Sequence, residues 1–271
     1  MNLKQLYKSG FFLAGVLLAA TAVAQTTVDA STESNLEANL DAQGDAPIKI
    51  AGVALEYRLR ENGSDQYNKL VEKLAEKKLD FNLVIFPLTR AVRNLTEGAD
   101  CIFPSSLNSL GTHFAEQTKG YEFIASNPVD YISMRVFTRQ GEKTIAAFNE
   151  LNNKKVAIWL GFDRNIYLQG INATVDEVAS EEVRVNMLTK KRVDAIVGFT
   201  PDVFLAAQKL GVAIPEYNKS LSVFEGEGAS VVCHKNAKNS QFIEQLNTQL
   251  EMLRESGELA SILGPYATLV K

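Results

Sequence analysis

The chain has few of the residues that hold metals or build disulfide frameworks. It contains two histidines, His113 and His234, and two cysteines, Cys101 and Cys233. Neither histidine has a His, Cys or carboxylate companion at metal-ligand spacing, so we expect no metal site and no cofactor. The sequence also has no nucleophile elbow and no pair of carboxylates suited to acid–base chemistry, which argues against an enzyme.

An excess of positive charge is missing too. The formal net charge is −4 at pH 7, and the lysines are scattered along the chain. A protein of this kind offers no basic stripe for DNA or RNA, so we expect no nucleic-acid partner. The composition, with 46% hydrophobic and 22% charged residues, is globular and excludes a largely disordered protein.

Long apolar runs are confined to the N-terminus. Lys4 and Lys8 precede the apolar stretch 11–20, and a small-x-small cleavage site follows at residues 22–24. The apolar stretch is too short for a membrane span, and no second one follows. We therefore expect a cleavable signal peptide over residues 1–24 and export to the periplasm. Cleavage removes two lysines and no acid, which takes the formal charge from −4 to −6.

Export bears on the two cysteines, because an oxidising compartment allows a disulfide to persist. Both Cys101 and Cys233 fall in expected strands. Two interpretations stand at this point. The two residues are either small buried hydrophobes or a bridged pair, and bridging requires their Cα atoms to approach within about 7 Å.

The organisation of the chain is clearest at residues 82–106. The run 83–86 is apolar and too short for a helix, which suits a buried strand. Pro87 then begins a helix with apolar residues at helical spacing, and Gly98 ends it. Another strand starts at Cys101. This strand–helix–strand unit is typical of parallel sheets, whose ligands lie beyond the carboxyl ends of the strands.

A second helix–turn–strand unit around residues 188–198 suggests two similar halves. We therefore predict an α/β protein of two lobes, each a mostly parallel sheet flanked by helices, joined by two crossing strands near 131–138 and 225–233. Residues 25–46 are rich in small polar residues and form a flexible leader. The expected boundaries place residues 47–134 and 229–271 in lobe one and residues 135–228 in lobe two.

Some segments are assigned individually. We expect strands at 48–53, 155–160, 183–185 and 193–197, and helices at 165–169, 240–256 and 258–263. The polar stretch 108–120 has no clear assignment. Trp159 follows an apolar residue in an expected strand, so we interpret it as a packing residue.

Five short motifs occur in an order that carries a resemblance. They are Arg90…Leu95…Gly98-Ala99-Asp100, Ser126-Asn127-Pro128, Lys154-Lys155-Val156-Ala157-Ile158 before Gly161, Arg192-Val193-Asp194-Ala195, and Leu253-Arg254-Glu255-Ser256-Gly257. In this order the chain resembles the type II periplasmic solute-binding proteins, specifically extracellular solute-binding protein family 3, which contains the polar amino-acid receptors of ABC importers. The resemblance covers residues 47–265 and implies two lobes that close on a solute.

Three departures from that family concern the ligand. In the receptors that the chain resembles, an arginine after the second unit's strand clamps the ligand carboxylate, a glycine-threonine turn also binds it, and an acidic residue holds the ammonium. Here residues 103–109 lack an arginine, the turn is Gly161-Phe162-Asp163, and Phe199 stands at the acidic place. Buried charges need partners, so the departures argue against an ordinary α-amino acid and favour a flatter or less charged solute.

The candidate ligand-binding residues lie at the ends of the expected strands and in the turns that follow them. They are Tyr57, Thr89, Arg90, Phe103, Ser105, Phe162, Asp163, Arg164 and Phe199. Arg90 is either a substitute cation for the ligand or a member of a surface salt bridge. The side chains of Tyr57 and Phe103 either line the cleft or belong to the core.

The expected function is that of a monomeric periplasmic receptor. It would capture a small polar or aromatic solute between its lobes and present the closed form to an inner-membrane ABC permease. One alternative keeps the receptor and makes its partner a membrane sensor. A less favoured alternative is a dehydratase-like enzyme, because the same fold hosts a few of them and fold does not fix function.

Overall fold

The computed structural model describes residues 46–162, 164 and 168–270, which form a mixture of strands and helices. The expected signal peptide and leader, Asp163 and most of the helix expected at 165–169 lie outside these residues. The elements before the first crossing strand are β1 (Ile48–Val53), α2 (Gln66–Glu76), β2 (Phe81–Phe86), α3 (Leu88–Glu97), β3 (Cys101–Ser105), α4 (Leu107–Thr112) and β4 (Phe123–Ala125).

The remaining elements complete both lobes. They are β5 (Asp130–Thr138), η1 (Phe148–Leu151), β6 (Lys155–Trp159), β7 (Thr174–Val178), α6 (Glu181–Thr189), β8 (Ala195–Thr200), α7 (Asp202–Leu210), β9 (Glu216–Tyr217), β10 (Phe224–His234), α8 (Ala237–Glu255) and α9 (Glu258–Leu263). None of the helices in the described residues is long and apolar enough to cross a membrane.

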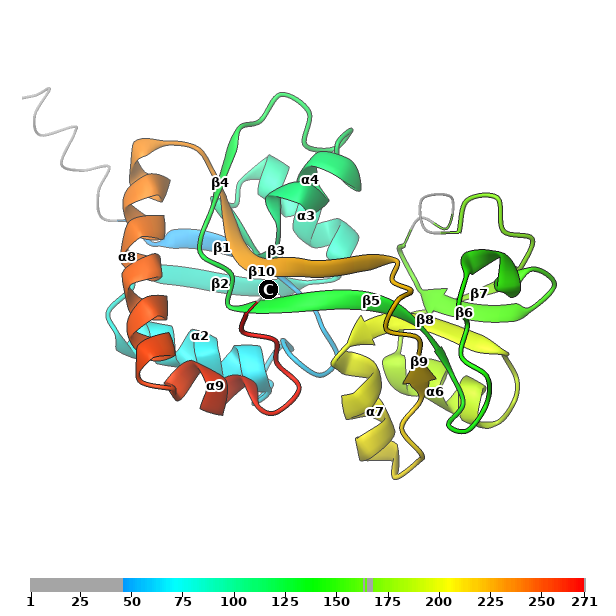
Figure 1. The fold of residues 1–271 in the computed structure, drawn as a ribbon. Helices are drawn as coiled ribbons and strands as arrows, with labels where there is room; N and C mark the ends of the chain where they lie inside the picture. Colours follow the sequence, from blue (N-terminus) through cyan, green and yellow to red (C-terminus); the bar gives the residue numbers. More distant parts are fainter. Residues whose placement is uncertain (1–45, 163, 165–167, 271) are drawn as a thin grey trace, which may run out of the picture. The chain divides into compact units, whose positions relative to one another are not determined.

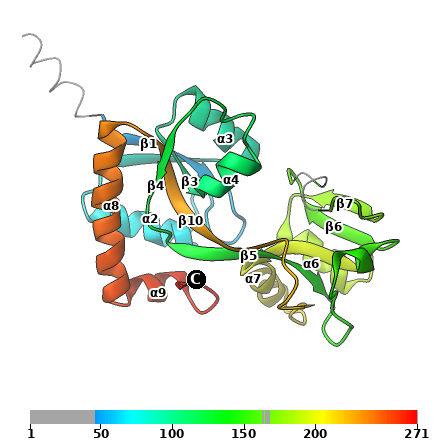
Figure 2. The same ribbon diagram turned by 45° about the horizontal axis from the view of Figure 1, so that its top comes forward.

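The strands follow the order β2-β1-β3-β10-β5-β8-β6-β7. β1 pairs in parallel with β2 and β3, and β6 pairs in parallel with β7 and β8, so each lobe has its own parallel set. The long strands β5 and β10 pair antiparallel with each other and connect the two sets, as Figures 1 and 2 show. The two crossing strands predicted from the sequence are therefore β5 and β10. The exact lobe boundaries stay a prediction.

The sheet of lobe one is covered on both faces. Ile48 and Ile50 of β1 join the helices α2, α8 and α9 on one face, while Ala51 and Val53 join α3 and α4 on the other. Side chains alternate between the faces of a strand, so β1 contributes to both cores at once. This double burial explains why β1 is almost continuously apolar and why the sequence predicts its limits well.

Lobe two is built in the same way. Val156 and Ile158 of β6 belong to one core with residues of β5 and β8, and Ala157 belongs to the opposite core with α6 and α7. The carboxyl ends of β1, β3, β6 and β8 are Val53, Ser105, Trp159 and Thr200. The residues at these ends are the ones that position the site described below.

The strand expected at 183–185 is wrong, because these residues lie in α6. Ser180 precedes the helix, and its Oγ accepts a hydrogen bond from the Val183 amide at 3.3 Å. Glu181 and Glu182 stand in the first turn, where negative charge favours a helix N-terminus. The strand of this region, β7, lies one segment earlier. Of the stretch 108–120, which has no clear assignment from the sequence, residues 108–112 belong to the short helix α4 (Leu107–Thr112).

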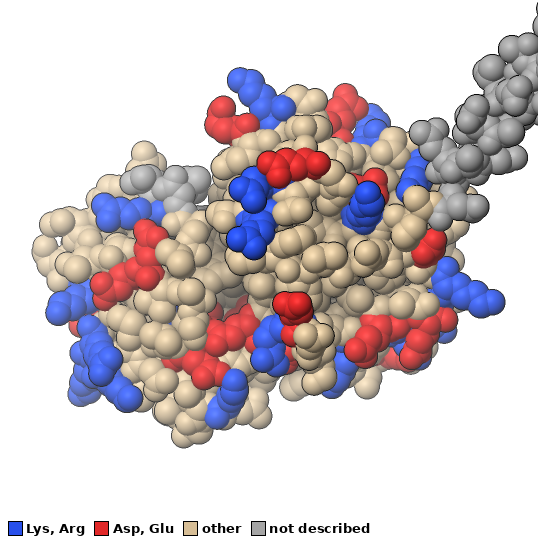
Figure 3. Space-filling view, turned by 180° about the vertical axis from the view of Figure 1, so that it is seen from behind, with Lys and Arg blue, Asp and Glu red and all other residues tan. Residues whose placement is uncertain are grey.

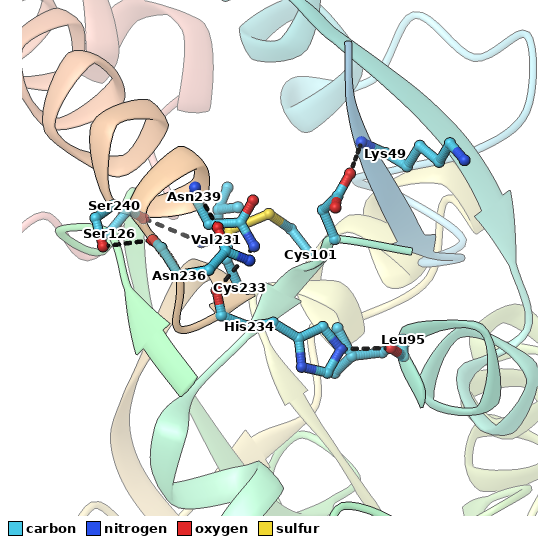
Figure 4. Close-up of a disulfide and its surroundings, with 11 residues drawn as sticks. Lys49, Leu95, Cys101, Ser126, Val231, Cys233, His234, Asn236, Asn239 and Ser240 are labelled. Carbon is cyan, nitrogen blue, oxygen red and sulfur yellow. Dashed lines mark hydrogen bonds between the residues drawn. A yellow bond between two sulfur atoms is a disulfide. The ribbon is translucent and has the colours of Figure 1, made fainter. Parts of the chain in front are cut away.

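Cys101 and Cys233 form a disulfide, with an S–S distance of 2.04 Å and a Cα–Cα distance of 3.9 Å. The two residues face each other in the register of β3 and β10, and neither is exposed. Figure 4 shows the bridge beside the start of α8, where the Asn236 side chain accepts a hydrogen bond from the Asn239 amide at 2.8 Å. Of the two interpretations of the cysteines, the structure shows the bridged pair.

Charges of both signs are interspersed on the face drawn in Figure 3, where neither Lys and Arg nor Asp and Glu form a continuous field. Among the charged residues of the surface, Arg60 pairs with Asp65 and Lys73 pairs with Glu258. Exposed pairs of this kind contribute little to stability, about 0–1 kcal/mol each. The mixture of charges in Figure 3 is typical of an ordinary solvated surface.

Candidate functional site

A cavity of about 270 Å³, called the cleft below, lies at the carboxyl ends of β1, β3, β6 and β8. Val53, Ser105, Trp159 and Phe199, at or next to those four ends, all line it. The crossing strand β10 contributes Phe224 and residues 227–229 to the lining of the cleft. In open α/β sheets ligands bind outside the carboxyl ends of the strands, so the cleft is the expected position for a ligand.

One wall of the cleft is aromatic and comes from lobe two and β10. The ring of Phe199 lies 5.8 Å from that of Trp159, 5.6 Å from that of Phe162 and 5.9 Å from that of Phe224, between centroids. Phe162 and Trp159 are 5.2 Å apart. These tilted and edge-on arrangements are the favourable ones for aromatic pairs. The wall presents ring faces and edges rather than charged groups.

The wall from lobe one combines apolar and polar residues, with Leu88, Val92 and Ile102 beside the hydrogen-bonding groups. It contains the side chains of Thr89, Ser105, Ser106, Ser109, His113 and Gln117. Burial lowers the pKa of His113, which outweighs the raising effect of Glu227, so the imidazole favours its neutral form. Hydroxyl, amide and neutral imidazole groups donate and accept hydrogen bonds without fixing a charge on the ligand.

Glu227 of β10 supplies a carboxylate to the cleft wall. Its Oε2 accepts a hydrogen bond from Ser106 Oγ at 2.9 Å, and its Oε1 accepts one from Asn108 Nδ2 at 2.6 Å. Glu225 lies two positions earlier and would share a face with Glu227 in a regular strand. Between them Gly226 has a φ of 58°, and the register with β5 shifts there, so Glu225 instead pairs with Arg135.

Arg58, in the loop after β1, is the cation of the cleft wall and is 1% exposed. Its Nε donates to Asp202 Oδ1 at 3.0 Å and its Nη2 to Oδ2 at 2.7 Å. Its Nη1 donates to the hydroxyl of Tyr67 at 3.0 Å, and that hydroxyl in turn lies 3.3 Å from Asp130 Oδ2. Asp202 begins α7 and Asp130 begins β5, so the charge of Arg58 is matched inside the protein and the pair joins the two lobes.

A second cavity, called the side cavity below, also measures about 270 Å³ and shares Leu55, Trp159 and Phe199 with the cleft. Glu56 reaches across it to α6, where its carboxylate accepts hydrogen bonds from Ser180 Oγ at 3.0 Å and the Glu181 amide at 2.5 Å. Glu56 therefore fixes the loop after β1 to the N-terminus of α6, and Arg58 fixes the same loop to α7.

Two of the residues that line the side cavity, Glu181 and Arg184, form a buried ion pair. Glu181 is 4% exposed, Arg184 is 2% exposed, and the carboxylate of the first binds Nη2 of the second. Burial raises the pKa of Glu181 to about 7, although Arg184 opposes the shift. The carboxyl group therefore titrates near neutral pH.

The structure places the predicted site residues in two groups. Thr89, Ser105, Phe162 and Phe199 line the cleft. The others do not line it or are not described. Tyr57 packs beside α7, with Lys209 Nζ 5.5 Å from its ring centroid, and Phe103 is buried against Tyr67. Arg90 and Arg164 are exposed and do not line the cleft, and Asp163 lies outside the described residues.

Sequence reasoning missed four residues that matter in the cleft: Arg58, Ser106, Trp159 and Glu227. Trp159 was interpreted as packing, and it does contact both lobes' cores, but it lines both cavities as well. Ser106 was detectable, because it precedes α4 and its Oγ accepts from the Ser109 amide at 2.9 Å. Arg58 and Glu227 gave no local signal, since their partners are 144 and 121 residues away.

No group of three or more His, Cys, Asp or Glu side chains in the described residues is arranged to hold a metal ion. The carboxylates near the cleft are instead tied to protein donors, as the contacts of Asp202 and Glu227 show. The cleft therefore offers apolar and aromatic contact, hydrogen-bonding groups from lobe one and the carboxylate of Glu227.

Comparison with known proteins relies on structure, since no protein-family model and no curated protein matches the sequence. The GluR0 ligand-binding core from Nostoc punctiforme in complex with L-glutamate matches with 21% identity and a TM-score of 0.63, over 80% of this chain and 97% of that one. A histidine kinase sensor domain with similarity to periplasmic binding proteins matches with 12% identity and a TM-score of 0.64, over 84% and 100%.

An ancestral arginine-binding protein bound to arginine matches with 18% identity and a TM-score of 0.58, over 79% of this chain and 95% of that one. In each case almost the whole solved structure is covered. At these identities the likeness establishes the fold. The chain has the two-lobe α/β fold of the type II periplasmic solute-binding proteins.

Proposed function

We propose that the protein is a solute receptor that binds a small organic molecule in the cleft. The observation that carries the proposal is the cleft itself, a cavity of about 270 Å³ with an aromatic wall on lobe two and with hydroxyl, amide and imidazole groups among the apolar residues of lobe one. Two lobes joined by the paired strands β5 and β10 are suited to hinge closure around such a molecule. The matched structures are named as binding cores, a sensor domain and a binding protein, which supports binding over catalysis.

The solute differs in kind from those of the matched proteins. Glutamate and arginine, named in those structures, are α-amino acids with a carboxylate and an ammonium group. In this cleft the guanidinium of Arg58 is already matched by Asp202, and Phe199 stands at the place where the resemblance expects an acid. An unmatched buried carboxylate costs several kcal/mol, so a zwitterionic amino acid is a poor fit.

The experiment is a thermal-shift screen of amino acids, amines, organic acids and neutral aromatics with the mature chain. A ligand at about 100 times its dissociation constant adds roughly 2.7 kcal/mol to stability, enough to raise the melting temperature by several degrees. Each hit is then titrated against two variants. Phe162→Ala removes a cleft ring and should weaken binding tenfold or more, while Phe148→Ala removes a half-buried ring that packs in lobe two away from the cleft.

The proposal fails if no compound stabilises the protein, or if the two variants weaken the hits equally. Loss of affinity only in Phe162→Ala is the expected result. Because both rings are partly buried members of the same core cluster, the comparison separates a lost ligand contact from general damage to lobe two.

We further propose export to the periplasm and presentation of the closed form to a membrane protein. The proposal rests on the signal-peptide pattern before Gln25. Cell fractionation and N-terminal sequencing test it, with a mature chain starting at Gln25 as the expected result. An ABC permease is one candidate partner, because the substrate binding protein of an amino-acid ABC transporter is among the matched structures. The matched histidine kinase sensor domain supports a signalling partner as the second candidate.

Deleting the gene distinguishes the two partners. Loss of uptake of the hit compound supports the importer, and intact uptake with a lost transcriptional response to the compound supports the sensor.

A further inference from the structure

The charges around the cleft do not cancel. Two charged side chains line it, Arg58 and Glu227, within the described part of the chain. Arg58 forms a bidentate pair with Asp202, whose side chain is 6% exposed. Glu227, by contrast, has no Lys, Arg or His nitrogen within 4.0 Å among the described residues and is held only by the neutral donors of Ser106 and Asn108. The cleft wall therefore carries one uncompensated negative charge.

The hydrogen bonds of Glu227 fix where that charge lies. Ser106 donates to one carboxylate oxygen and Asn108 to the other, and both residues lie at the start of α4. Each carboxylate oxygen has a second lone pair, so both oxygens still accept from a ligand. Gly226, with its φ of 58°, allows the chain to direct Glu227 to the cleft while Glu225 pairs with Arg135 at 2.5 Å. The carboxylate is thus oriented before any ligand arrives.

The rest of the cleft favours the same sign of ligand charge. Phe199, Phe162, Trp159 and Phe224 surround the apolar side, and the faces of aromatic rings carry partial negative charge that attracts cations. His113 is not a permanent cation, because burial disfavours its charged form. No unmatched cation remains in the described lining to receive a carboxylate.

We propose that the solute is an organic amine, whose ammonium group binds Glu227 and whose aromatic or aliphatic body packs against the aromatic wall. The inference rests on the proposed receptor function and names the ligand class of the same cleft. It makes Glu227 the residue that determines specificity for charge. Neutral hydroxyl compounds of the same shape bind more weakly, and carboxylates bind most weakly.

The test uses isothermal calorimetry with three matched sets of compounds on the mature chain. Each set keeps one body, phenyl, indolyl or cyclohexyl, and changes the end group from an amine to an alcohol to a carboxylate. The expected result for at least one body is an amine that binds tenfold or more tightly than its alcohol. The variant Glu227→Gln, which retains an acceptor for Ser106, should remove that preference.

Glu225→Gln is the matched control, because it makes the same change two positions away on a side chain that pairs outside the cleft. It should keep the preference for amines. The inference is overturned if alcohols or carboxylates bind as tightly as amines, if no member of any set binds, or if Glu227→Gln keeps the preference. If alcohols bind as tightly as amines, or if Glu227→Gln keeps the preference for amines, the receptor function can still be correct. It is then supported by alcohol binding that Phe162→Ala weakens and Phe148→Ala does not, so failure of the amine inference is distinguished from failure of the receptor function.

Discussion

Arg58 and Asp202 join the two lobes through two parallel hydrogen bonds, of 3.0 Å from Nε to Oδ1 and 2.7 Å from Nη2 to Oδ2. The side chains are 1% and 6% exposed. Removing one partner of such a pair leaves the other as a buried, uncompensated charge. Because Asp202 already pairs with Arg58, the guanidinium in the cleft wall is not free to pair with a carboxylate of a ligand.

We expect Asp202→Asn to lower the free energy of unfolding by about 3–5 kcal/mol, measured by urea denaturation. Asp65→Asn is the control. It breaks the pair between Arg60 and Asp65, whose side chains are 49% and 20% exposed, and it too lies at the start of a helix. That change should cost about 0–1 kcal/mol. Equal losses in the two variants would contradict the structural role given to Arg58.

The disulfide is expected to stabilise lobe one without affecting ligand binding. The double variant Cys101→Ala/Cys233→Ala should lose about 2–5 kcal/mol of stability, since the bridge connects residues 132 positions apart and restricts the unfolded chain. Neither cysteine lines the cleft. Urea denaturation with and without reductant checks the first claim, and titration of a screening hit checks the second.

For the wild type, reductant should lower the urea midpoint, whereas the double variant should not respond to reductant. A reductant effect that persists in the double variant would show that the loss has another origin.

Glu181 should make stability depend on pH. Its pKa rises from 4.5 to about 7 on folding, so the folded state binds more protons than the unfolded state between these values. Stability from this group is present below about pH 4.5 and is lost as the pH rises through 7. The shift corresponds to roughly 3 kcal/mol, at about 1.4 kcal/mol for each pKa unit.

The measurement compares urea denaturation of the wild type and Glu181→Gln at pH 4.5 and pH 8. The difference in stability between the two pH values should be smaller in the variant by up to about 3 kcal/mol. Other titrating groups, Asp130 among them, remain in both proteins and cancel in this comparison. An identical pH dependence in the two proteins would show that Glu181 is not buried as described.

Much of the architecture could be predicted from local pattern. The limits of β1 and α9 agree with the expectation, because a doubly buried strand is continuously apolar and a short helix between Gly257 and Gly264 is bounded on both sides. The strand expected at 183–185 failed for a local reason as well. Two valines there suggested a strand, but the preceding Ser180 and two acidic residues start a helix.

The site was harder to predict, because its important contacts are long-range. Phe162 and Phe199 were found because they replace expected residues at the ends of strands. Arg58 pairs with a residue 144 positions later, and nothing in the sequence around it indicates burial. Glu227 depends on the irregularity at Gly226, and period-two alternation would have placed it on the same face as Glu225. The positions of Arg58 and Glu227 in the cleft wall therefore depend on tertiary structure that the local sequence does not indicate.

A fluorescence titration of Trp159 tests directly whether the ligand binds in the cleft. Trp159 is the single tryptophan of the chain, and it lines the cleft. A screening hit should change its emission saturably with one ligand per protein, at the dissociation constant that the thermal shift implies. A compound that stabilises the protein but leaves Trp159 emission unchanged in a full titration would place binding elsewhere and contradict the proposed receptor site.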